Sequence, residues 1–246
     1  MNEIIIKTEK VTRTFKSGGE TVHALRGVSL EIPKGKLTVL RGRSGSGKTT
    51  LLNIMSGLDK PTEGRVFFNG EDISAMLPSR RDRLRGRSMG FVFQSIALMP
   101  DMDAVENIEY SLRIAKAARR GVRKKDMPDN RIGGIGTKGA RGRIEECLKK
   151  VGLEKRIKHL ASELSGGEQQ RVAIARSFAH KPLVVFADEP TAELDTATGI
   201  QVVDIFKQLI SSEGLTVVMT THDPNMLELA DKVYTLTDGM ITDGND

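Results

Sequence analysis

Several features that would place a chain in other protein classes are missing from this sequence of 246 residues. A single cysteine, Cys147, excludes an internal disulfide, and we expect it to pack as a small residue on a helix. No cluster of Cys and His has zinc-ligand spacing. No stretch approaches the roughly 20 apolar residues that cross a bilayer, and the start of the chain lacks a secretory signal. We therefore expect a cytoplasmic protein that does not span a membrane.

The excess of positive charge, +6 overall, has a local source. Residues 116–143 contain ten Lys or Arg and two Asp, whereas the rest of the chain is slightly acidic. Basic surfaces attract polyphosphates and acidic lipid headgroups. The glycine-rich part of this segment, residues 117–142, predicts a solvated insertion or, as a second interpretation, a docking patch.

Short apolar runs predict the strands of a mainly parallel sheet. They lie at 37–40, 183–187 and 215–221, and continuous runs of this kind suit strands that are covered on both faces. The segment between the last two has apolar residues at helical spacing, namely Ile200, Val203, Phe206 and Ile210. We therefore expect an α/β fold with a doubly wound sheet, in which functional groups gather at the carboxyl ends of the strands.

Three other patterns predict smaller units beside this core. The first 30 residues and the stretch 65–70 are typical of antiparallel strands with Gly and Asn turns, which indicates a β subdomain. Residues 95–160 have apolar side chains three and four apart and predict a helical subdomain. The tail predicts a hairpin that turns at Asp238 and Gly239.

The segment Gly42 to Thr49, GRSGSGKT, matches the phosphate-binding pattern of two glycines, a lysine and a hydroxyl at fixed spacing. It follows a predicted strand and opens a predicted helix, so backbone N–H groups and the positive helix end can surround phosphates. Gly45 and Gly47 permit close approach, Lys48 would neutralise the β- and γ-phosphates, and Thr49 could ligate magnesium. The alternative is an ordinary glycine turn before a helix. The predicted contacts to ATP are Gly42, Arg43, Ser44, Gly45, Ser46, Gly47, Lys48, Thr49 and Thr50.

Two adjacent carboxylates, Asp188 and Glu189, close the apolar run 183–187. Asp188 would hold magnesium through water, and Glu189 would accept a proton from the attacking water. Such a pair also occurs as simple strand-end solvation, but together with the phosphate loop it predicts nucleotide hydrolysis. A kinase, a GTPase or a helicase would still fit.

The segment LSGGEQQRVAIAR, residues 164–176, separates these alternatives. Ser165, Gly166 and Gly167 open a predicted helix whose free N–H groups would form a second anion site. Because the chain has one phosphate loop, the economical arrangement is a head-to-tail homodimer, in which this segment of one copy covers the γ-phosphate held by the other. A simple kinase would have no use for it.

Taken together, the motifs resemble those of the ABC ATPase family over nearly the whole chain. Five motifs follow the phosphate loop in family order: FVFQ with Gln94, LSGGE, VVFADEP with its acid pair, AELD ending at Asp195, and THD with His222. The resemblance implies a P-loop NTPase fold, with a doubly wound, mainly parallel sheet, an antiparallel β subdomain and a helical subdomain.

The resemblance also implies a single ABC ATPase domain over residues 1–246. Its nucleotide-binding core and β subdomain would comprise 1–94 and 161–246. The helical subdomain, with the basic insertion, would take 95–160.

Roles for single residues follow from the same resemblance. The implied metal ligands are Thr49, Gln94 and Asp188. The implied catalytic residues are Lys48, Glu189 and His222, of which His222 contacts the γ-phosphate. The signature residues that reach the ATP of the other copy are Ser165, Gly166, Gly167 and Glu168, and Asp195 belongs to the loop between subunits. Phe15 would stack on adenine, although it could equally lie in the core.

By this resemblance, two copies close on two Mg-ATP, hydrolyse it and drive a separate integral membrane permease subunit from the cytoplasmic face of the membrane. The sequence looks most like the branch that serves lipoprotein release, macrolide export, cell-division and antimicrobial-peptide-resistance complexes. That branch implies export or extraction from the membrane. The transported substrate is a property of the membrane partner.

The basic insertion suggests a second class, an ABC protein that acts on nucleic acid or on the ribosome. Those proteins carry long coiled coils or two ATPase modules in one chain, and neither is present, so no nucleic-acid partner is expected. The insertion would instead present Arg119, Arg120, Lys124 and Lys125 to anionic lipid or to a loop of the membrane subunit. The family pattern also has Gln more often than Glu at position 168, and Asn or Ala where AELD has Glu.

Overall fold

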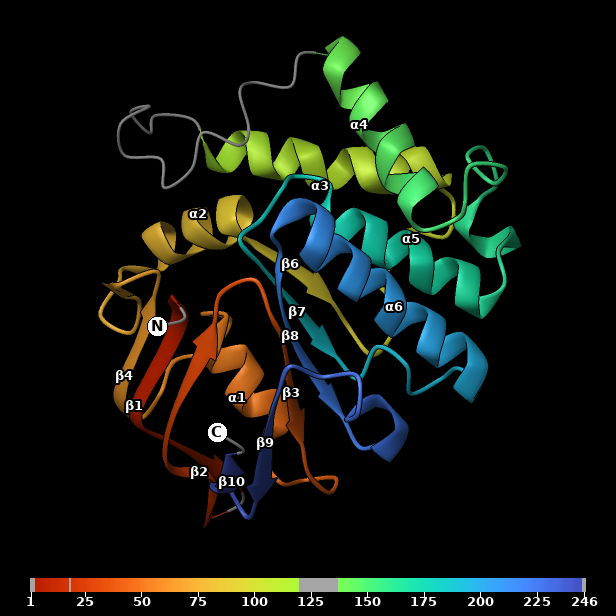
Figure 1. Ribbon diagram of the computed structural model, residues 1–246. Helices are drawn as coiled ribbons and strands as arrows, with labels where there is room; N and C mark the ends of the chain where they lie inside the picture. Colours follow the sequence, from red (N-terminus) through yellow and green to blue (C-terminus); the bar gives the residue numbers. More distant parts are fainter. Residues whose placement is uncertain (1–2, 18, 120–136, 245–246) are drawn as a thin grey trace.

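The structure is a computed structural model that describes residues 3–17, 19–119 and 137–244. Within them, the structure contains one β-sheet of six strands and one of four (Figure 1). Arg120, Lys124 and Lys125 of the predicted docking patch lie outside the described residues.

The larger sheet has the strand order β10-β9-β3-β8-β7-β6. Neighbouring strands are parallel except β10, which runs antiparallel to β9. The strands are β3 (Leu37–Arg41), β6 (Met89–Val92), β7 (Val184–Asp188), β8 (Thr216–Thr221), β9 (Lys232–Thr237) and β10 (Met240–Gly244). The three predicted parallel strands and the terminal hairpin are confirmed. Strand β6 is not among the predicted strands, because its four residues are too short an apolar run to stand out.

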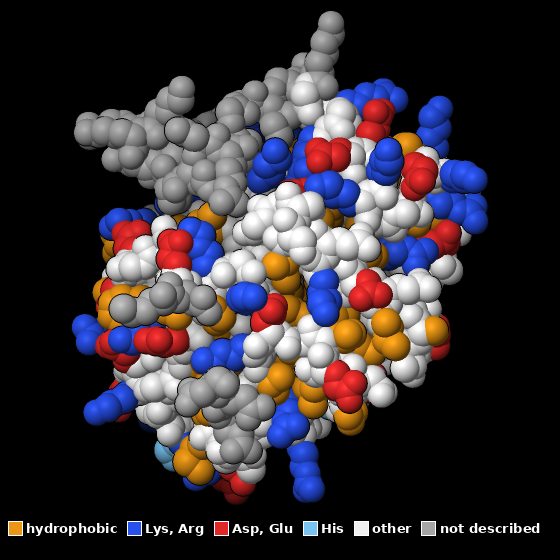
Figure 2. Space-filling view, viewed as in Figure 1, with side chains coloured by type: hydrophobic (Ala, Val, Ile, Leu, Met, Phe, Trp, Pro, Cys, Tyr) orange, Lys and Arg blue, Asp and Glu red, His pale blue; other side chains and the backbone are white. Residues whose placement is uncertain are grey.

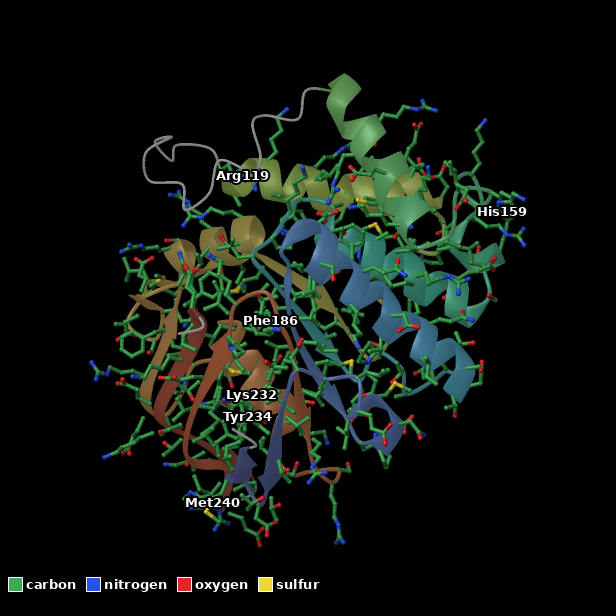
Figure 3. All side chains as sticks on the ribbon, viewed as in Figure 1. Arg119, His159, Phe186, Lys232, Tyr234 and Met240 are labelled. Atoms are coloured by element: carbon green, nitrogen blue, oxygen red, sulfur yellow. The ribbon has the colours of Figure 1, made fainter. Side chains whose placement is uncertain are left out.

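The smaller sheet is antiparallel and has the order β2-β1-β4-β5. Its strands are β1 (Ile4–Ser17), β2 (Glu20–Pro33), β4 (Glu63–Phe68) and β5 (Glu71–Asp72). The predicted β subdomain is therefore confirmed. Tyr234 on β9 joins the two sheets, because its hydroxyl donates to Glu31 O on β2 at 2.7 Å, while Lys232 lies over its ring (Figure 3).

The described ranges contain six α-helices: α1 (Lys48–Met55), α2 (Pro78–Ser88), α3 (Ala104–Ala118), α4 (Thr137–Lys150), α5 (Gly166–Phe178) and α6 (Thr196–Glu213). Short 3₁₀ turns lie at Ala161–Glu163 and Pro224–Met226. Helices α3, α4 and α5 pack together at the top of the view in Figure 1, in the region where a helical subdomain is predicted. Its limits, 95–160, stay a prediction.

Both ends of the predicted insertion are helical. Helix α3 runs to Ala118 and α4 begins at Thr137, so 117–118 and 137–142 belong to helices and not to a solvated loop. Later turns of α4 are anchored by the buried side chains of Ile144 and Cys147, and the helix extends back from them. The bounds of the insertion, 117–142, stay a prediction.

The strands of the larger sheet bury alternate residues on opposite faces. On β3, Leu37 and Val39 face one core cluster together with α5 and α6, whereas Leu40 faces a second cluster together with α1. On β7, Phe186 belongs to the second cluster, at the centre of the molecule (Figure 3). This explains the continuous apolar runs, and it places α1 on the opposite face of the sheet from α5 and α6 (Figure 1).

Helix α6 confirms the predicted helical segment, but one of its residues was assigned to the wrong face. Val203 and Phe206 are fully buried, whereas Ile200 is 37% exposed. Gly199 takes the inner position in the first turn, where an added Cβ would lie 3.3 Å from Met226 Cε. The close packing favours glycine there, so the buried stripe begins one residue earlier than predicted.

Cys147 is fully buried on α4, and burial raises the pKa of its thiol to about 12, which keeps the thiol protonated. The expectation of a small packed residue is confirmed. Among the helices of the described ranges, none combines the length and the apolar composition that a bilayer crossing requires.

Arg143 on α4 joins the C-terminal ends of α5 and α6. Its side chain is 5% exposed and donates to Phe178 O and Ala179 O at 3.1 Å each. It also donates to both carboxylate oxygens of Glu213, at 3.0 and 2.7 Å. Burial opposes its charge, but the hydrogen bonds to Glu213 prevail and raise the pKa of Arg143. Removing either partner would break this mostly buried ion pair, although Glu146 also contacts Arg143 and Lys150 also contacts Glu213.

His180, two residues beyond α5, is buried, and its Nε2 donates to Met89 O at 3.1 Å. Its Nδ1 has no hydrogen-bond partner among the described residues. Burial lowers the pKa of His180 to about 4, and the guanidinium groups of Arg119 and Arg143 act in the same direction. His180 is therefore neutral in the folded protein at neutral pH.

We predict that acidification destabilises the fold through His180. An unfolded chain protonates histidine near pH 6.5 and the folded chain only near pH 4, so between these values the unfolded state binds more protons. The free energy of unfolding should fall by about 2 kcal/mol from pH 8 to pH 5 through this residue. Urea unfolding of the wild type and of His180→Gln, which keeps a donor for Met89 O, measures the effect. The same pH dependence in both proteins would contradict the prediction.

Candidate functional site

The phosphate loop between β3 and α1 has the geometry of an anion site. Helices α3, α5 and α6 begin with side-chain caps, whereas α1 begins after Gly47, which has no side chain to cap it. The first N–H groups of α1 are therefore available to a ligand, and the positive end of the helix dipole favours an anion. Gly47 has φ 104°, and an added Cβ would lie 2.6 Å from Ala24 O, so this close approach requires glycine.

The other predicted loop residues lie in the loop and in the first turn of α1. Arg43, Ser44 and Gly45 are exposed, while Ser46 is buried and its Oγ lacks a hydrogen-bond partner among the described residues. Gly42 precedes this tip, and Thr50 follows in the helix. Their contacts to ATP stay predictions.

Lys48 folds back over its own loop. Its Nζ donates to Gly42 O at 2.9 Å and to Arg43 O at 3.2 Å, and it lies 3.5 Å from Glu189 Oε1. The side chain is 5% exposed. The ammonium group is thus already held above the loop that is predicted to receive the phosphates.

Asp188 meets the phosphate loop at the end of β7. Thr49 Oγ1 donates to Asp188 Oδ1 at 3.0 Å, and Thr220 Oγ1 on β8 donates to the same oxygen at 2.7 Å. A hydroxyl and a carboxylate from two different elements therefore lie side by side, as the carboxyl-end arrangement predicts. Oxygen ligands of this kind suit magnesium.

Glu189 has a left-handed backbone, φ 45°, which is uncommon for any residue except glycine. Its N–H donates to Thr220 Oγ1 at 2.8 Å. One carboxylate oxygen faces Lys48, and the other lies 3.2 Å from His222 Nδ1. The three residues predicted to be catalytic are therefore in direct contact around one carboxylate, although their roles stay predictions.

Gln94 lies two residues beyond β6, which pairs in parallel with β7, Val92 opposite Ala187. It is exposed at the same edge of the sheet as Asp188. Its position fits the predicted role, and its ligation of magnesium stays a prediction.

The residues present fit magnesium that arrives with a nucleotide. In residues 3–17, 19–119 and 137–244, no group of three or more His, Cys, Asp or Glu side chains is arranged to hold a metal ion. Magnesium usually takes one or two carboxylates together with substrate phosphates. Thr49 and Asp188 supply such a partial ligand set, which phosphate oxygens would complete.

Phe15 is 38% exposed on β1. The alternative that it lies in the core is therefore wrong. Stacking on adenine stays a prediction.

The signature Ser165 caps α5, and its N-terminus is less free than the sequence analysis predicts. Ser165 Oγ accepts a hydrogen bond from Glu168 N at 3.3 Å, while Glu168 Oε2 accepts from Ser165 N and Ser165 Oγ at 2.9 Å each. These bonds lower the pKa of Glu168. The pattern Ser-x-x-Glu is a capping box, so the glutamate that departs from the family pattern closes the helix end. Gly166, where an added Cβ would meet nothing within 4 Å, is the open part of the turn.

Asp195 caps α6 and lies beside the signature. Its carboxylate accepts hydrogen bonds from Thr198 N at 3.0 Å and Thr198 Oγ1 at 2.6 Å, which lower its pKa. Thr198 also borders Gly167, where an added Cβ would lie 3.1 Å from Thr198 Cγ2. Gln170, which the sequence analysis does not single out, connects α5 to the segment after Glu189 through Pro190 O at 2.8 Å. The signature and Asp195 form a second group, on helices of the opposite sheet face from α1.

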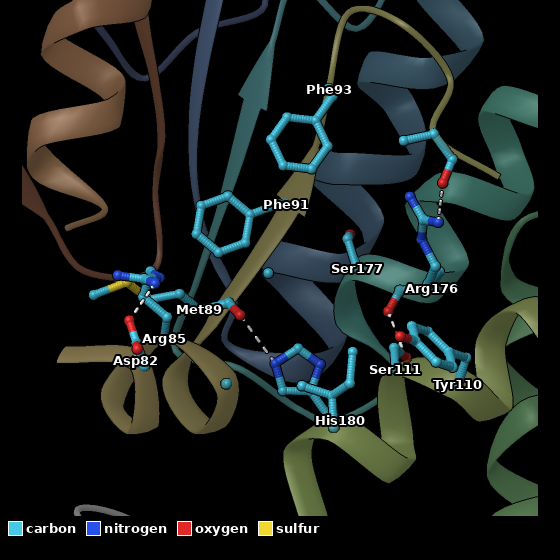
Figure 4. A pocket seen from close by; sticks show the side chains of 14 residues that line it. Asp82, Arg85, Met89, Phe91, Phe93, Tyr110, Ser111, Arg176, Ser177 and His180 are labelled. Carbon is cyan, nitrogen blue, oxygen red and sulfur yellow. Dashed lines mark hydrogen bonds and ion pairs between the residues drawn. The ribbon is translucent and has the colours of Figure 1, made fainter. Parts of the chain in front are cut away.

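A groove of about 400 Å³ opens between α2, β6, α3 and α5 (Figure 4). Its wall contains the exposed side chains of Phe93, Tyr110 and Ile114, which are 40%, 44% and 48% exposed. Phe93 stacks on Phe91 with ring centroids 5.9 Å apart. Phe93 also directly precedes Gln94, so the groove adjoins the nucleotide edge of the sheet. The groove has no local signal in the sequence, because four separate elements build it.

Comparison with known proteins finds one family. The sequence profile described as "ABC transporter" matches residues 25–192. The macrolide export ATP-binding/permease protein MacB of Syntrophobacter fumaroxidans is 40% identical over 96% of this chain, which spans only 31% of MacB. The lipoprotein-releasing system ATP-binding protein LolD of Legionella pneumophila is 37% identical over 98% of both chains.

The solved structures give the same result. The ATP-binding cassette MJ0796 of Methanocaldococcus jannaschii, a dimer in a post-hydrolysis state bound to ADP and Pi, has a TM-score of 0.85 with this chain. The two are 37% identical over 98% of both chains. The predicted P-loop NTPase fold and the likeness to the macrolide-export and lipoprotein-release branch are confirmed. The chain therefore belongs to the ABC transporter family and is one of its ATP-binding domains.

Proposed function

We propose that this chain is the ATP-hydrolysing subunit of a transporter complex. The observation that carries the proposal is the cluster of Lys48, Asp188, Glu189 and His222 beside the uncapped N-terminus of α1. A phosphate cradle, a magnesium-type ligand pair and a carboxylate for proton transfer are the parts that nucleotide hydrolysis needs.

In this proposal, each residue of the cluster has a separate task. The N–H groups of the loop and of α1 bind phosphates, and Lys48 exchanges its loop carbonyls for phosphate oxygens. Thr49, Gln94 and Asp188 hold magnesium, which neutralises phosphate charge when bound. Glu189 accepts a proton from the attacking water. His222 orients the Glu189 carboxylate from the side on which the γ-phosphate lies.

A second copy of the chain completes the site. The signature and Asp195 lie beside each other but on helices of the opposite sheet face from α1. A head-to-tail homodimer brings them to the nucleotide of the other copy, so that each ATP lies between two subunits. The dimeric MJ0796 structure supports this arrangement.

The groove beside Phe93 is the docking place that we propose for an integral membrane permease subunit. Its exposed apolar side chains suit a helix of a partner, and its charged rim includes Asp82, Arg85 and Arg176 (Figure 4). Because Gln94 follows Phe93, docking there would act directly on the nucleotide site. The chain would then work on the cytoplasmic face of the membrane.

The likeness to MacB and LolD favours export or extraction from the membrane over uptake. The alternative, an ABC protein acting on nucleic acid or the ribosome, rests on the basic insertion. On the face shown in Figure 2, the described Lys and Arg side chains are interspersed with Asp and Glu, which does not favour binding to a polyanion.

The test compares ATP hydrolysis by the purified chain alone, with polynucleotide, and with vesicles that contain the co-expressed membrane subunit. We expect the vesicles to recruit and stimulate the chain and polynucleotide to have no effect. Ile114→Asp, in the groove, should weaken recruitment at least about tenfold without changing basal hydrolysis. The matched control is Met240→Asp, at a similarly exposed position, 46%, on β10 far from the groove (Figure 3). Stimulation by polynucleotide would contradict the transporter function.

A further inference from the structure

Arg13 and Asp59 form an ion pair directly behind the ring of Phe15. Arg13 Nε lies 2.8 Å from Asp59 Oδ2, and Arg13 Nη2 lies 3.1 Å from Asp59 Oδ1. The guanidinium carbon lies 4.3 Å from the centroid of the Phe15 ring. One face of the ring is therefore covered by a cation that a carboxylate holds through two hydrogen bonds, while the ring remains 38% exposed.

The segment around Asp59 connects the ring to the phosphate-binding helix. Asp59 follows α1, and its N–H donates to Asn53 O of that helix at 3.0 Å. Thr62 of the same segment bonds to β1 twice: its N–H donates to Thr12 O at 2.8 Å, and its Oγ1 accepts from Thr14 N at 3.0 Å. The strand that carries Phe15 is thereby fixed to the helix that begins with Lys48.

The pair differs from an ordinary surface ion pair. The side chains of Arg13 and Asp59 are only 24% and 32% exposed, so solvent screens them less than a fully exposed pair. The two parallel hydrogen bonds fix the plane of the guanidinium, and a planar guanidinium can lie against an aromatic face. An aromatic ring held in this way loses little rotamer freedom when a ligand stacks on its other face.

We propose that Arg13, oriented by Asp59, is a positioning residue for the purine base of the nucleotide. It holds the Phe15 ring so that the base stacks on the face opposite the guanidinium. The inference rests on the proposed function and on the prediction that Phe15 stacks on adenine, and it adds Arg13 and Asp59 to that contact. Neither residue contacts the cluster of Lys48, Asp188, Glu189 and His222 in the contacts of the described residues, so they should affect affinity and not the chemical step.

The experiment measures nucleotide binding to the full chain by titration calorimetry. Arg13→Met keeps the apolar stem but removes both the cation and the ion pair, and we expect it to weaken ATP binding about three- to tenfold. Binding of GTP should weaken equally, since stacking does not distinguish the bases. Binding of inorganic tripolyphosphate, which has no base, should not change. Arg13→Lys, which keeps the charge but not the planar group, should lie between Arg13→Met and the wild type.

A double-mutant cycle with Phe15→Ala separates the possibilities. If Arg13 acts through the ring, Arg13→Met has no further effect on ATP binding in the Phe15→Ala protein. Unchanged ATP binding by Arg13→Met and Arg13→Lys, with a loss in Phe15→Ala, would overturn the role of Arg13 and leave the base contact intact. Unchanged binding by Phe15→Ala would overturn the base contact itself. An equal loss of tripolyphosphate binding would also overturn the inference, because it would show an effect on the phosphate loop.

Discussion

Replacement of Glu189 by Gln is expected to lower ATP turnover by about 10²–10⁴-fold, because the amide cannot accept a proton from the attacking water. The new side chain has nearly the same size, so the backbone N–H can keep its 2.8 Å hydrogen bond to Thr220 Oγ1. ATP should still bind, since the phosphate loop and Lys48 are intact. The ATP-bound dimer should therefore accumulate. Phosphate release and size-exclusion chromatography with ATP measure the two effects.

The matched control is Glu154→Gln, the same chemical change at an exposed position in the loop after α4. It should leave turnover and assembly at the level of the wild type. Normal turnover by the Glu189→Gln protein would exclude Glu189 as the proton acceptor. A loss of turnover without any ATP-dependent dimer would separate hydrolysis from assembly and contradict the shared site.

Replacement of Ser165 by Asp should abolish ATP-dependent dimerisation and cooperative hydrolysis. Asp can still accept from Glu168 N as a helix cap, but its carboxylate also faces Glu168 Oε2, so circular dichroism of the monomer first has to show that the chain folds. The carboxylate, however, would stand where the γ-phosphate of the other copy is proposed to lie. Like charges brought together in an interface cost several kcal/mol, so the dimer should weaken by about 100-fold or more. Analytical ultracentrifugation with ATP, in the Glu189→Gln background, measures this.

Ser165→Asn is the control for this variant, because Asn caps a helix equally well without adding charge. It should dimerise far better than Ser165→Asp. Both variants should bind ATP as monomers, since Ser165 lies on a helix of the opposite sheet face from α1. If Ser165→Asp paired and hydrolysed ATP cooperatively, the arrangement of ATP between two copies would have to be abandoned.

The site was predictable wherever its residues follow a strand in a local motif. The phosphate loop after β3, the acid pair after β7 and His222 after β8 all lie at the carboxyl end of parallel strands, so the sheet brings them together. The apolar runs that reveal these strands are continuous because helices cover both faces. For the same reason the fold class could be predicted without any long-range information.

Features that depend on single contacts were not predictable. Glu189 adopts a left-handed backbone, which its residue type does not predict. Thr220 bonds to both Asp188 and the N–H of Glu189, but a threonine in an apolar strand gives no sign of these hydrogen bonds. Helix α2 buries only Leu84 and Ser88, so it has no apolar stripe to reveal it. For Glu168, by contrast, the signal was present: Ser-x-x-Glu predicts a capping box, and the family comparison alone made the residue look like a departure.

The buried guanidinium of Arg143 has a mechanical consequence. Helices α5 and α6 begin at Ser165 and Asp195, the two segments that we propose to face the other copy, and both end at this one side chain on α4. A displacement of α3, α4 and α5 by a membrane partner would therefore move both segments together. We therefore expect the segments at Ser165 and Asp195 to approach and leave the ATP of the other copy at the same time.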